Sequence, residues 1–386
     1  MSASATCPRT ASPLILLFAC AAGLSVANVY YAQPLLDALA ADLGIGTARI
    51  GAVIAATQLG SVAALLWLVP LGDRLRRHRL LAVQNVALVM ALLGVAVAGS
   101  ATTLLLGMLA VGLLGTAMTQ GLIAYAAAAA SPHERGRVVG AAQAGVVIGL
   151  LLARVVAGAV ADIGGWRAVY GLSAGLMVIT GVLVWLRLPR LAVPAAVPRV
   201  SLPALLRTQP VLRRRGMLGL LMFIAFGLFW STVALPLSAP PHALGHTAIG
   251  AFGLVGALAA ARSGHWSDQG HAGRVSGAAL LLLLVSWIPL AALPVHLGWL
   301  VLGVLLLDLA VQALHVTNQS LILAAAPQAQ AQAIAAYMLF YAAGSGIGAV
   351  AGSALYAAHG WSAVCGAGAV VSGGALMLWA RARRSP

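Results

Sequence analysis

The stretch LGDRLRRHR at Leu71–Arg79 places one acidic residue, Asp73, among four arginines in an otherwise hydrophobic chain. A shorter related stretch, GHWSDQGHAGR at Gly264–Arg274, places Asp268 195 residues after Asp73. The same spacing separates two prolines and two Gly-Trp pairs, namely Pro132 and Pro327, and Gly165-Trp166 and Gly360-Trp361. Coincidences at one spacing indicate that the second half of the chain repeats the first.

The composition indicates which medium surrounds the folded chain. Hydrophobic residues make up 62% of the sequence and charged residues only 8%, whereas a soluble domain carries about 25% charged residues. Lipid must therefore surround most of the chain. Backbone polar groups in lipid must be satisfied internally, and the apolar runs here are continuous, so the sequence predicts spanning helices instead of a barrel. Duplicated halves in such a chain are typical of secondary transporters.

Twelve apolar segments are each long enough to cross a bilayer, which takes about 20 residues. They cover approximately 13–34, 48–71, 79–99, 102–125, 136–161, 167–187, 215–238, 247–266, 275–294, 298–324, 331–357 and 361–380. We therefore predict an all-α membrane protein with twelve transmembrane helices in two pseudo-symmetric six-helix bundles. The bundles are expected at 1–187 and 215–386, joined on the cytoplasmic side by a linker over 188–214 that contains five prolines.

The basic residues predict the orientation of the chain. All 22 are arginines, and 19 of them fall on one side of the predicted spans, with Arg49 and Arg167 on the other side and Arg154 inside a span. The positive-inside rule places the arginine-rich side, and with it both termini, in the cytoplasm. This clustering between apolar runs explains the net charge of +15 without nucleic-acid binding. The all-arginine, alanine-rich composition indicates a GC-rich bacterial genome, and we expect the chain in the bacterial inner membrane.

Val69–His78 resembles the best-known signature of the major facilitator superfamily, which reads roughly G-x-x-x-D-R-x-G-R-R and joins the second and third helices. The stretch matches at three positions and departs at both glycines: Asp73, Arg74 and Arg77 match, and Val69 and Arg76 depart. The second-half copy keeps the first glycine and the acid, as Gly264 and Asp268. The resemblance implies twelve helices around a central cavity, worked by alternating access.

Four further stretches resemble bacterial efflux permeases of the arabinose-efflux or acriflavine-sensitivity type. They are Asn28–Pro34, Glu134–Gly140, Leu152–Arg154 and Val311–Gln319. The Gly-Pro signature that many drug antiporters carry on the fifth helix is missing, and Arg154 lies in that region instead. The resemblance covers the whole chain.

The loop motif at Val69–His78 also suggests a gate. The resemblance implies that Asp73, Arg74 and Arg77 form a charge network at the cytoplasmic gate, which stabilises the outward-open state. A purely topological loop would have no use for the pair of acids at 73 and 268. The alternative is that these arginines only set topology. Further candidates for the same network are Glu134, Arg135, Arg137, Gly264 and Asp268.

The tenth predicted helix carries a polar stripe. Asp308, Gln312, His315 and Gln319 follow the spacing i, i+4, i+7 and i+11, which places the last three within roughly 40° of Asp308 around the helix. Asn318 lies to the side of the stripe. Charge at mid-bilayer is costly, by at least about 2.5–3.5 kcal/mol, so the stripe should face a wet cavity or a partner. The alternative is a structural hydrogen-bond seam between helices.

Arg154 is the only arginine deep in a predicted span, and Asp308 lies at a similar depth. A carboxylate whose surroundings alternate between apolar burial and a nearby arginine can take up and release a proton. We therefore expect Asp308 to be the proton-coupling acid, with Arg154 as its partner and His315 as a further titratable group. A static ion pair, or Arg154 as an anchor for an anionic substrate, remain alternatives.

The repeat extends the list of residues that could line a substrate cavity. Gln120 corresponds to His315 at the 195-residue spacing, and Thr116 lies one turn before it. Tyrosines of the eleventh helix can line the cavity or simply pack. The substrate-binding candidates are Asn28, Tyr31, Thr116, Gln120, Gln143, Arg154, Gln312, His315, Asn318, Gln319, Tyr337 and Tyr341.

Glycines recur every four residues in two segments that correspond at the same spacing. They are Gly145 and Gly149 in the first half and Gly344, Gly348 and Gly352 in the second. Small residues let helices approach closely. At the junction of the halves they would allow sliding, and tight packing explains them equally well.

We expect a secondary transporter, in the first place a proton-coupled exporter of a small organic compound, acting as a monomer in the bilayer. Proton-coupled uptake is the alternative. A membrane-embedded enzyme or sensor is more distant, because the sequence has no metal-ligand or nucleophile–base motif and no soluble output domain. The three cysteines, Cys7, Cys20 and Cys365, have no metal or disulfide spacing. No cofactor is expected, and the proton gradient would supply the energy.

Overall fold

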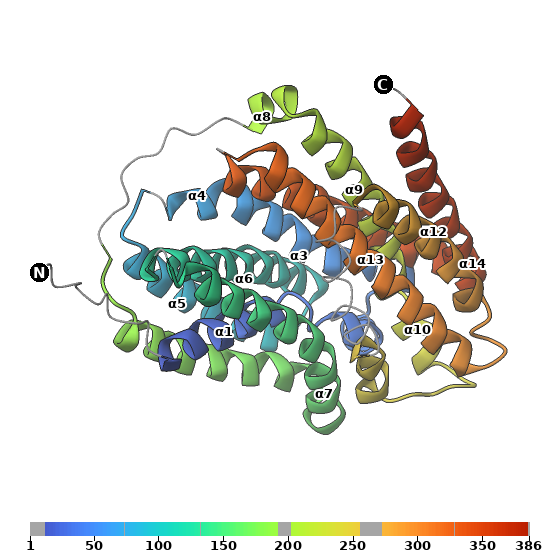
Figure 1. Ribbon diagram of the computed structural model, residues 1–386. Coiled ribbons are helices and arrows are strands. Elements are labelled where there is room, and N and C mark those ends of the chain that lie inside the picture. Colours follow the sequence, from blue (N-terminus) through green and yellow to red (C-terminus); the bar gives the residue numbers. More distant parts are fainter. Residues whose placement is uncertain are drawn as a thin grey trace, which may run out of the picture.

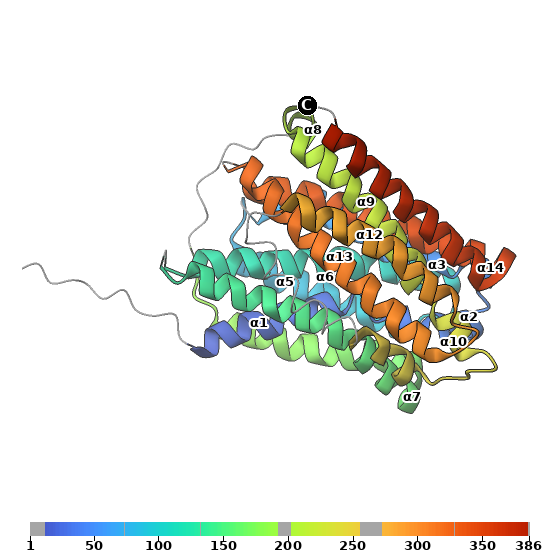
Figure 2. The ribbon, with the colours of Figure 1, turned by 45° about the vertical axis from the view of Figure 1, so that its right-hand side comes forward.

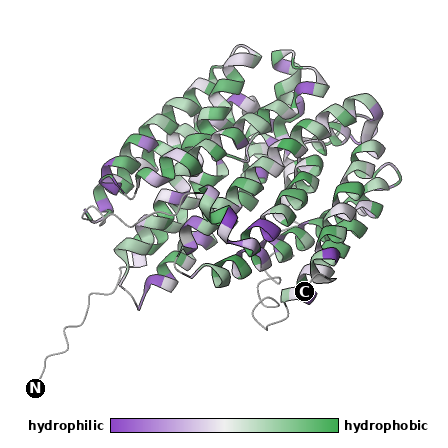
Figure 3. Cartoon of the chain, turned by 90° about the horizontal axis from the view of Figure 1, so that it is seen from above, coloured by the Kyte–Doolittle hydropathy of each residue, from purple (hydrophilic) through white to green (hydrophobic). Residues whose placement is uncertain are grey.

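The computed structural model describes residues 12–72, 74–131, 133–191, 202–254, 272–327 and 329–384. Within these ranges the chain is built from helices that run roughly alongside one another (Figure 1). The long helices run between the end of the bundle where Ser12 and Arg384 lie, here called the terminal end, and the opposite end, here called the far end. Hydrophobic residues cover most of the helix surfaces (Figure 3), as expected for contact with lipid.

The first half begins with α1, and 3-10 turns and a short helix follow it at the far end. The elements are α1 Ser12–Ala27, η1 Gln33–Leu35, α2 Leu36–Leu43, η2 Thr47–Arg49, α3 Gly51–Ala63, η3 Ala64–Leu68, α4 Val69–Leu71, α5 Arg77–Ala96, α6 Ala101–Ala129 and α7 Arg135–Arg187. The segment α3–η3–α4 is one continuous span whose central turn is a π-helix just before Pro70. The missing N–H of a proline disturbs the hydrogen-bond ladder one turn before it.

The second half follows the same plan (Figure 2). Its elements are α8 Leu202–Thr208, α9 Pro210–Trp230, α10 Ala234–Ser238, α12 Ala272–Ala291, α13 Leu297–Ala325 and α14 Gln330–Arg384. Residues 246–254 are helical and begin the span predicted at 247–266, the rest of which lies outside the described residues.

Two glycines turn the chain between helices at equivalent positions of the repeat. Gly165 interrupts α7 with φ 74°, and Gly360 interrupts α14 with φ 73°. This left-handed backbone region favours glycine. Each long element therefore crosses the bundle twice. Counted this way, eleven predicted helices lie within the described residues, and 246–254 begins the remaining one.

Two helix boundaries differ from the sequence prediction. The first helix ends at Ala27 and not near residue 34, and the chain turns into η1, where Pro34 has no N–H to continue an α-helical ladder. The seventh starts at Pro210 and not at 215, because proline is well suited to the first helical position. The arginines at 213–215 therefore belong to the helix, where long side chains can reach past the lipid.

Each half has its own hydrophobic core. One buried cluster runs from Phe18 to Leu188 and includes only Ala349 from the second half, and the other runs from Leu218 to Ala375. Between the two halves, α7 ends at Arg187 and α8 begins at Leu202. The exact limits of the linker, predicted at 188–214, remain a prediction.

The repeated glycines pack within the halves and not between them. A Cβ atom on Gly145 would lie 2.1 Å from the carbonyl oxygen of Ala19, and one on Gly149 would lie 2.2 Å from that of Gly23. In the second half, Gly348 packs in the same way against Ile224 of α9. These glycines therefore allow close approach of α1 to α7 and of α9 to α14, and the sliding role at the junction of the halves is wrong.

Candidate functional site

The two halves meet at the far end through two contacts that the repeat relates to each other. In one contact, Gly51 of α3 lies against Ala349 and Ser353 of α14. In the other, Gly158 of α7 lies against His246. Adding 195 to Gly51 gives His246, and adding 195 to Gly158 gives Ser353. The same pseudo-symmetric junction is thus built twice from different side chains.

The first junction, here called the small-residue contact, is uncharged. The Ser353 hydroxyl accepts a hydrogen bond from the Gly51 amide at 3.2 Å and lies 3.2 Å from the Ala48 carbonyl oxygen. A Cβ atom on Gly51 would come within 2.1 Å of the Ala349 carbonyl oxygen. Only glycine permits this approach.

The second junction, here called the charged contact, consists of Asp37, Asp162, His246 and Thr247. Asp162 of α7 accepts hydrogen bonds from the backbone amides of His246 at 3.0 Å and Thr247 at 2.9 Å. It also accepts from the Thr247 hydroxyl at 2.6 Å. A carboxylate from one half therefore caps the first turn of a helix in the other half, where free amides and the helix dipole favour negative charge.

His246 completes the charged contact. Its Nδ1 lies 2.9 Å from Asp162 Oδ1, and its Nε2 lies 3.4 Å from Asp37 Oδ2. The adjoining carboxylate of Asp37, together with that of Asp162, raises the pKa of His246 to about 9. His246 is therefore protonated near neutral pH while the far end is closed.

Deeper in the bundle, Arg154 of α7 is surrounded by aromatic rings. Only 1% of its surface is exposed. Its Nε donates to Gln33 Oε1 at 2.6 Å, and its guanidinium carbon lies 3.9 Å from the centre of the Trp230 ring, within cation–π range. Tyr30 and Phe226 approach at 5.8 and 5.9 Å. Its Nη2 has no hydrogen-bond partner among the described residues.

Asp308 of α13 contacts the same tryptophan at its indole nitrogen. The indole Nε1 of Trp230 donates to Asp308 Oδ1 at 3.4 Å, and the carboxylate is 6% exposed. Within the described part of the chain, Arg154 and Asp308 form no direct ion pair. Arg154, Trp230 and Asp308, here called the central trio, thus join the first half to the second through an aromatic ring.

The sequence predicted two members of the central trio and missed the third. It placed Arg154 and Asp308 at one depth, and the structure brings both to Trp230. A tryptophan in an apolar helix carries no signal that separates this role from packing. Gln33 carried a weak signal, since it lies in the stretch Asn28–Pro34 that resembles efflux permeases.

A second polar group surrounds His315. Its Nδ1 lies 3.0 Å from the Tyr337 hydroxyl and its Nε2 lies 3.0 Å from Gln319 Nε2. The Phe223 ring meets it edge-on. The Tyr341 hydroxyl is hydrogen-bonded to the Tyr30 hydroxyl of the first half. The structure therefore gathers four of the substrate-binding candidates, His315, Gln319, Tyr337 and Tyr341.

Other substrate-binding candidates lie elsewhere. Asn28 accepts a hydrogen bond from Ser173 at 2.5 Å inside the first half, and Tyr31 is buried in the same core. The Thr116 hydroxyl donates to Ser61 at 2.8 Å, between α6 and α3. Three glutamines make no hydrogen bond with a described residue and range from half-buried to exposed: Gln120, Gln312 and Gln143. Asn318 accepts from Arg215 at 3.4 Å.

The predicted gate at the terminal end is only partly described. Arg77 donates from Nε to the Gly72 carbonyl at 3.0 Å and from Nη1 to the Ala124 carbonyl at 3.2 Å. Glu134 pairs with Arg137 at 3.0 Å, Arg135 donates to the Ala127 carbonyl at 3.2 Å and Arg74 is exposed. The remaining candidates lie outside the described residues: Asp73, Gly264 and Asp268.

Similar proteins identify the family. The sequence profile of the Major Facilitator Superfamily matches residues 17–246. The "Uncharacterized transporter YgaY" of Escherichia coli O157:H7 is 37% identical over 378 residues, covering 95% of each chain. The "Probable transporter SCO4007" of Streptomyces coelicolor is 33% identical over 378 residues, covering 94% of this chain and 85% of the other.

Among solved structures, an inward-facing, occupied bacterial homologue of the human lysosomal transporter Spinster matches with a TM-score of 0.81 and 15% identity. The match covers 97% of each chain, so the folds are the same. The protein belongs to the major facilitator superfamily and is a multi-pass membrane transporter, not an enzyme. Its twelve-helix architecture is confirmed, whereas the efflux branch remains a prediction.

Proposed function

We propose that the protein exports a small organic compound in exchange for protons, with Asp308 as the proton-carrying acid. The central trio is the observation that supports this role. Asp308 and Arg154 are buried charges on opposite halves, and an isolated charge in such a place is costly and usually functional. Trp230 contacts both of them, so Asp308 is held near a positive charge without a direct ion pair.

Rocking of the halves would change this arrangement. Arg154 moves with the first half, whereas Trp230 and Asp308 move with the second. When Arg154 approaches, the ionised carboxylate is favoured and the proton is released. When Arg154 withdraws, apolar burial favours the protonated acid. Alternation between these two environments is what proton coupling requires.

The orientation in the membrane is part of the proposal. Arginines at the terminal end place both termini in the cytoplasm of a bacterial inner membrane by the positive-inside rule. The far end then faces outward. Its two contacts close the outward path, so the described arrangement corresponds to an outward-closed state. The chain would work as a monomer.

The group around His315 is the best candidate for substrate contact. It combines aromatic rings with neutral polar atoms and touches Tyr30 of the first half through Tyr341. Such a lining suits a compound with an apolar body and a few polar groups. Proton-coupled uptake uses the same parts in the reverse direction, so direction has to be measured.

The test uses everted membrane vesicles with an acidified lumen and a pH-sensitive dye. Addition of an exported compound should release protons and restore dye fluorescence with the wild type. Asp308→Asn should abolish this response at equal expression. Asp42→Asn serves as the matched control, because Asp42 is an exposed far-end acid that pairs with Arg167 at 2.5 Å.

The outcomes separate the parts of the proposal. A compound-dependent response in wild type and Asp42→Asn, with none in Asp308→Asn, supports both antiport and the role of Asp308. A full response in Asp308→Asn leaves antiport in place and removes Asp308 as its acid. Accumulation of compound driven by an inward proton gradient in right-side-out vesicles would replace export by uptake.

A further inference from the structure

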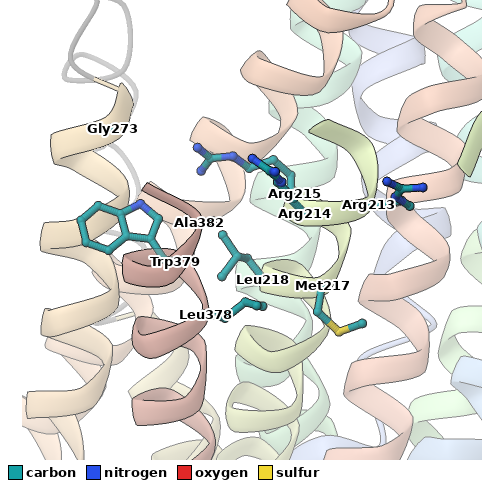
Figure 4. A pocket seen from close by; sticks show the side chains of 9 residues that line it. All are labelled: Arg213, Arg214, Arg215, Met217, Leu218, Gly273, Leu378, Trp379 and Ala382. Carbon is teal, nitrogen blue, oxygen red and sulfur yellow. The ribbon is translucent and has the colours of Figure 1, made fainter. Parts of the chain in front are cut away.

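A cavity of about 340 Å³ lies in the second half at the terminal end, away from the central trio. It is lined by residues of α9, α12 and α14, namely Arg213, Arg214, Arg215, Met217, Leu218, Gly273, Leu378, Trp379 and Ala382. In Figure 4, Arg214 and Arg215 lie together above apolar side chains, and Trp379 faces them across the cavity. Arg213 lies to one side.

We propose that this cavity binds an anionic phospholipid, with its phosphate held by Arg214 and Arg215 and its chains against Met217, Leu218 and Leu378. Three consecutive arginines sit at one side of an otherwise apolar cavity, and none of the described residues that line it is acidic. Arg214 makes no hydrogen bond or ion pair with a described residue, so its charge is uncompensated there. Positive charge beside apolar surface at a helix end matches a lipid better than a soluble anion.

The position of the cavity supports lipid access. Arg213, Arg214 and Met217 are exposed on α9, the helix that starts at Pro210 at the terminal end. Leu378 is 38% exposed near the end of α14. The lining is therefore open to the surroundings of the bundle at the level where helix ends meet lipid headgroups. Basic residues at this level attract anionic lipids.

The repeat indicates that the site is specific to the second half. The positions that correspond to the three arginines at the 195-residue spacing are Phe18, Ala19 and Cys20 of α1. None of these carries charge. Nonspecific contact with lipid headgroups would occur at every helix end, so it would not require an arginine cluster in only one half of the repeat.

Arg215 connects the cavity to the interior. Its Nη1 donates to Ser276 at 2.8 Å and lies 3.4 Å from Asn318 Oδ1. Asn318 is three residues from His315 on α13. A phosphate that recruits Arg215 would compete with these two hydrogen bonds, so lipid occupancy would also alter the position of Asn318.

The test titrates delipidated, detergent-purified protein with phosphatidylglycerol and counts bound lipids by native mass spectrometry. Wild type should retain one phosphatidylglycerol in preference to phosphatidylcholine. Arg214→Gln with Arg215→Gln should bind it about thirty-fold more weakly, since basic side chains act additively on an anionic headgroup. The matched control is Arg79→Gln with Arg187→Gln, two exposed arginines at the terminal end of the first half.

Two further arms identify the ligand. Met217→Gln with Leu378→Gln keeps the arginines and should also weaken phosphatidylglycerol, whereas displacement by inorganic phosphate should be negligible. If all variants bound phosphatidylglycerol equally, or if wild type bound both lipids equally, the proposed site would be overturned. Efficient displacement by inorganic phosphate, with no effect of the Met217 and Leu378 changes, would make it a soluble-anion site and overturn the lipid proposal. Unchanged thermal unfolding of each variant excludes misfolding as the cause.

Discussion

The small-residue contact and the charged contact occupy equivalent places in the two repeats and hold the far end closed by different means. At the small-residue contact, Gly51 meets Ala349 and Ser353 without any charge. At the charged contact, Asp162 and Asp37 hold His246. Both junctions have the close packing that duplication produced. Only the charged contact also has ionised side chains.

The asymmetry continues into the centre of the bundle. Arg154 corresponds to Ala349, and Asp308 corresponds to Leu113. Both charges of the central trio are therefore unique to one copy of the repeat. Close packing should matter at both junctions, whereas pH and charge substitutions should affect only the charged contact.

The largest effect should come from added bulk. Gly51→Ala puts a Cβ atom 2.1 Å from a backbone oxygen, and Gly158→Ala puts one 2.2 Å from the His246 carbonyl oxygen. Overpacking costs typically 1–3 kcal/mol, so each should shift the ratio of open to closed far ends by up to about a hundred-fold. Spin labels at the exposed positions Ala41 and Ala358 would report the separation of the halves.

Gly94→Ala is the control for this steric comparison, because a Cβ atom on Gly94 meets nothing within 4 Å. Equal behaviour of Gly51→Ala and Gly94→Ala would mean that the small-residue contact does not hold the far end closed.

The second effect should come from the cap at the charged contact. Asp162→Ala removes the acceptor for both the His246 and Thr247 amides. Loss of a cap costs about 1 kcal/mol and loss of its charged hydrogen bonds adds to that, so we expect a shift toward open of about twenty-fold. Ser353→Ala at the small-residue contact should shift it several-fold less. Equal shifts from both would remove the distinction between the contacts.

The third effect is a dependence on pH. The carboxylates raise the pKa of His246 in the closed far end to about 9, above its ordinary value of about 6.5. The stabilisation is thus fully present below about pH 6.5 and is lost as pH rises through about 9. Because His246 is partly exposed, solvent reduces the effect, and we expect about a five-fold shift toward open between pH 6 and 9.5.

The same labels measure this dependence, and His246→Gln should abolish it because glutamine does not titrate. Asp37 and Asp162 are the acidic groups that face His246. A pH response that persists in His246→Gln would assign it to another group.

The smallest effect should come from Arg167→Gln. Arg167 pairs with Asp42 at 2.5 Å, but both side chains are 43% exposed and both belong to the first half. Exposed pairs contribute about 0–1 kcal/mol, and this one does not cross between the halves. The open-to-closed ratio should stay within about two-fold of wild type, and a larger shift would show that the exposed pair also supports closure.

Much of the fold could be predicted because each spanning helix can be recognised from the sequence of its own segment. Apolar length identified the spans, and the gaps left between them at 162–166 and 358–360 contain the two turns at Gly165 and Gly360. The boundary at Pro210 was missed because arginines near a helix start look like a loop when burial is unknown. The repeated glycines were found, but their partners were not, since periodicity does not say which helix lies opposite.

The site was predicted less completely for the same reason. Depth along two helices could be counted, which placed Arg154 and Asp308 at one level. The ring of Trp230 between them and the bond from Gln33 depend on how α1, α7, α9 and α13 are rotated and packed. The charged contact was missed altogether, because Asp37, Asp162 and His246 lie in three separate segments without a common motif.

The sequence by itself determined that this chain folds as lipid-embedded helices and that it is duplicated. These properties follow from composition, segment length and the repeat spacing, which can be read along the chain. Only the tertiary structure decided that one junction of the halves is neutral and the other charged, and that Trp230 contacts both buried charges. Contacts between helices far apart in the sequence depend on packing, which no local pattern encodes.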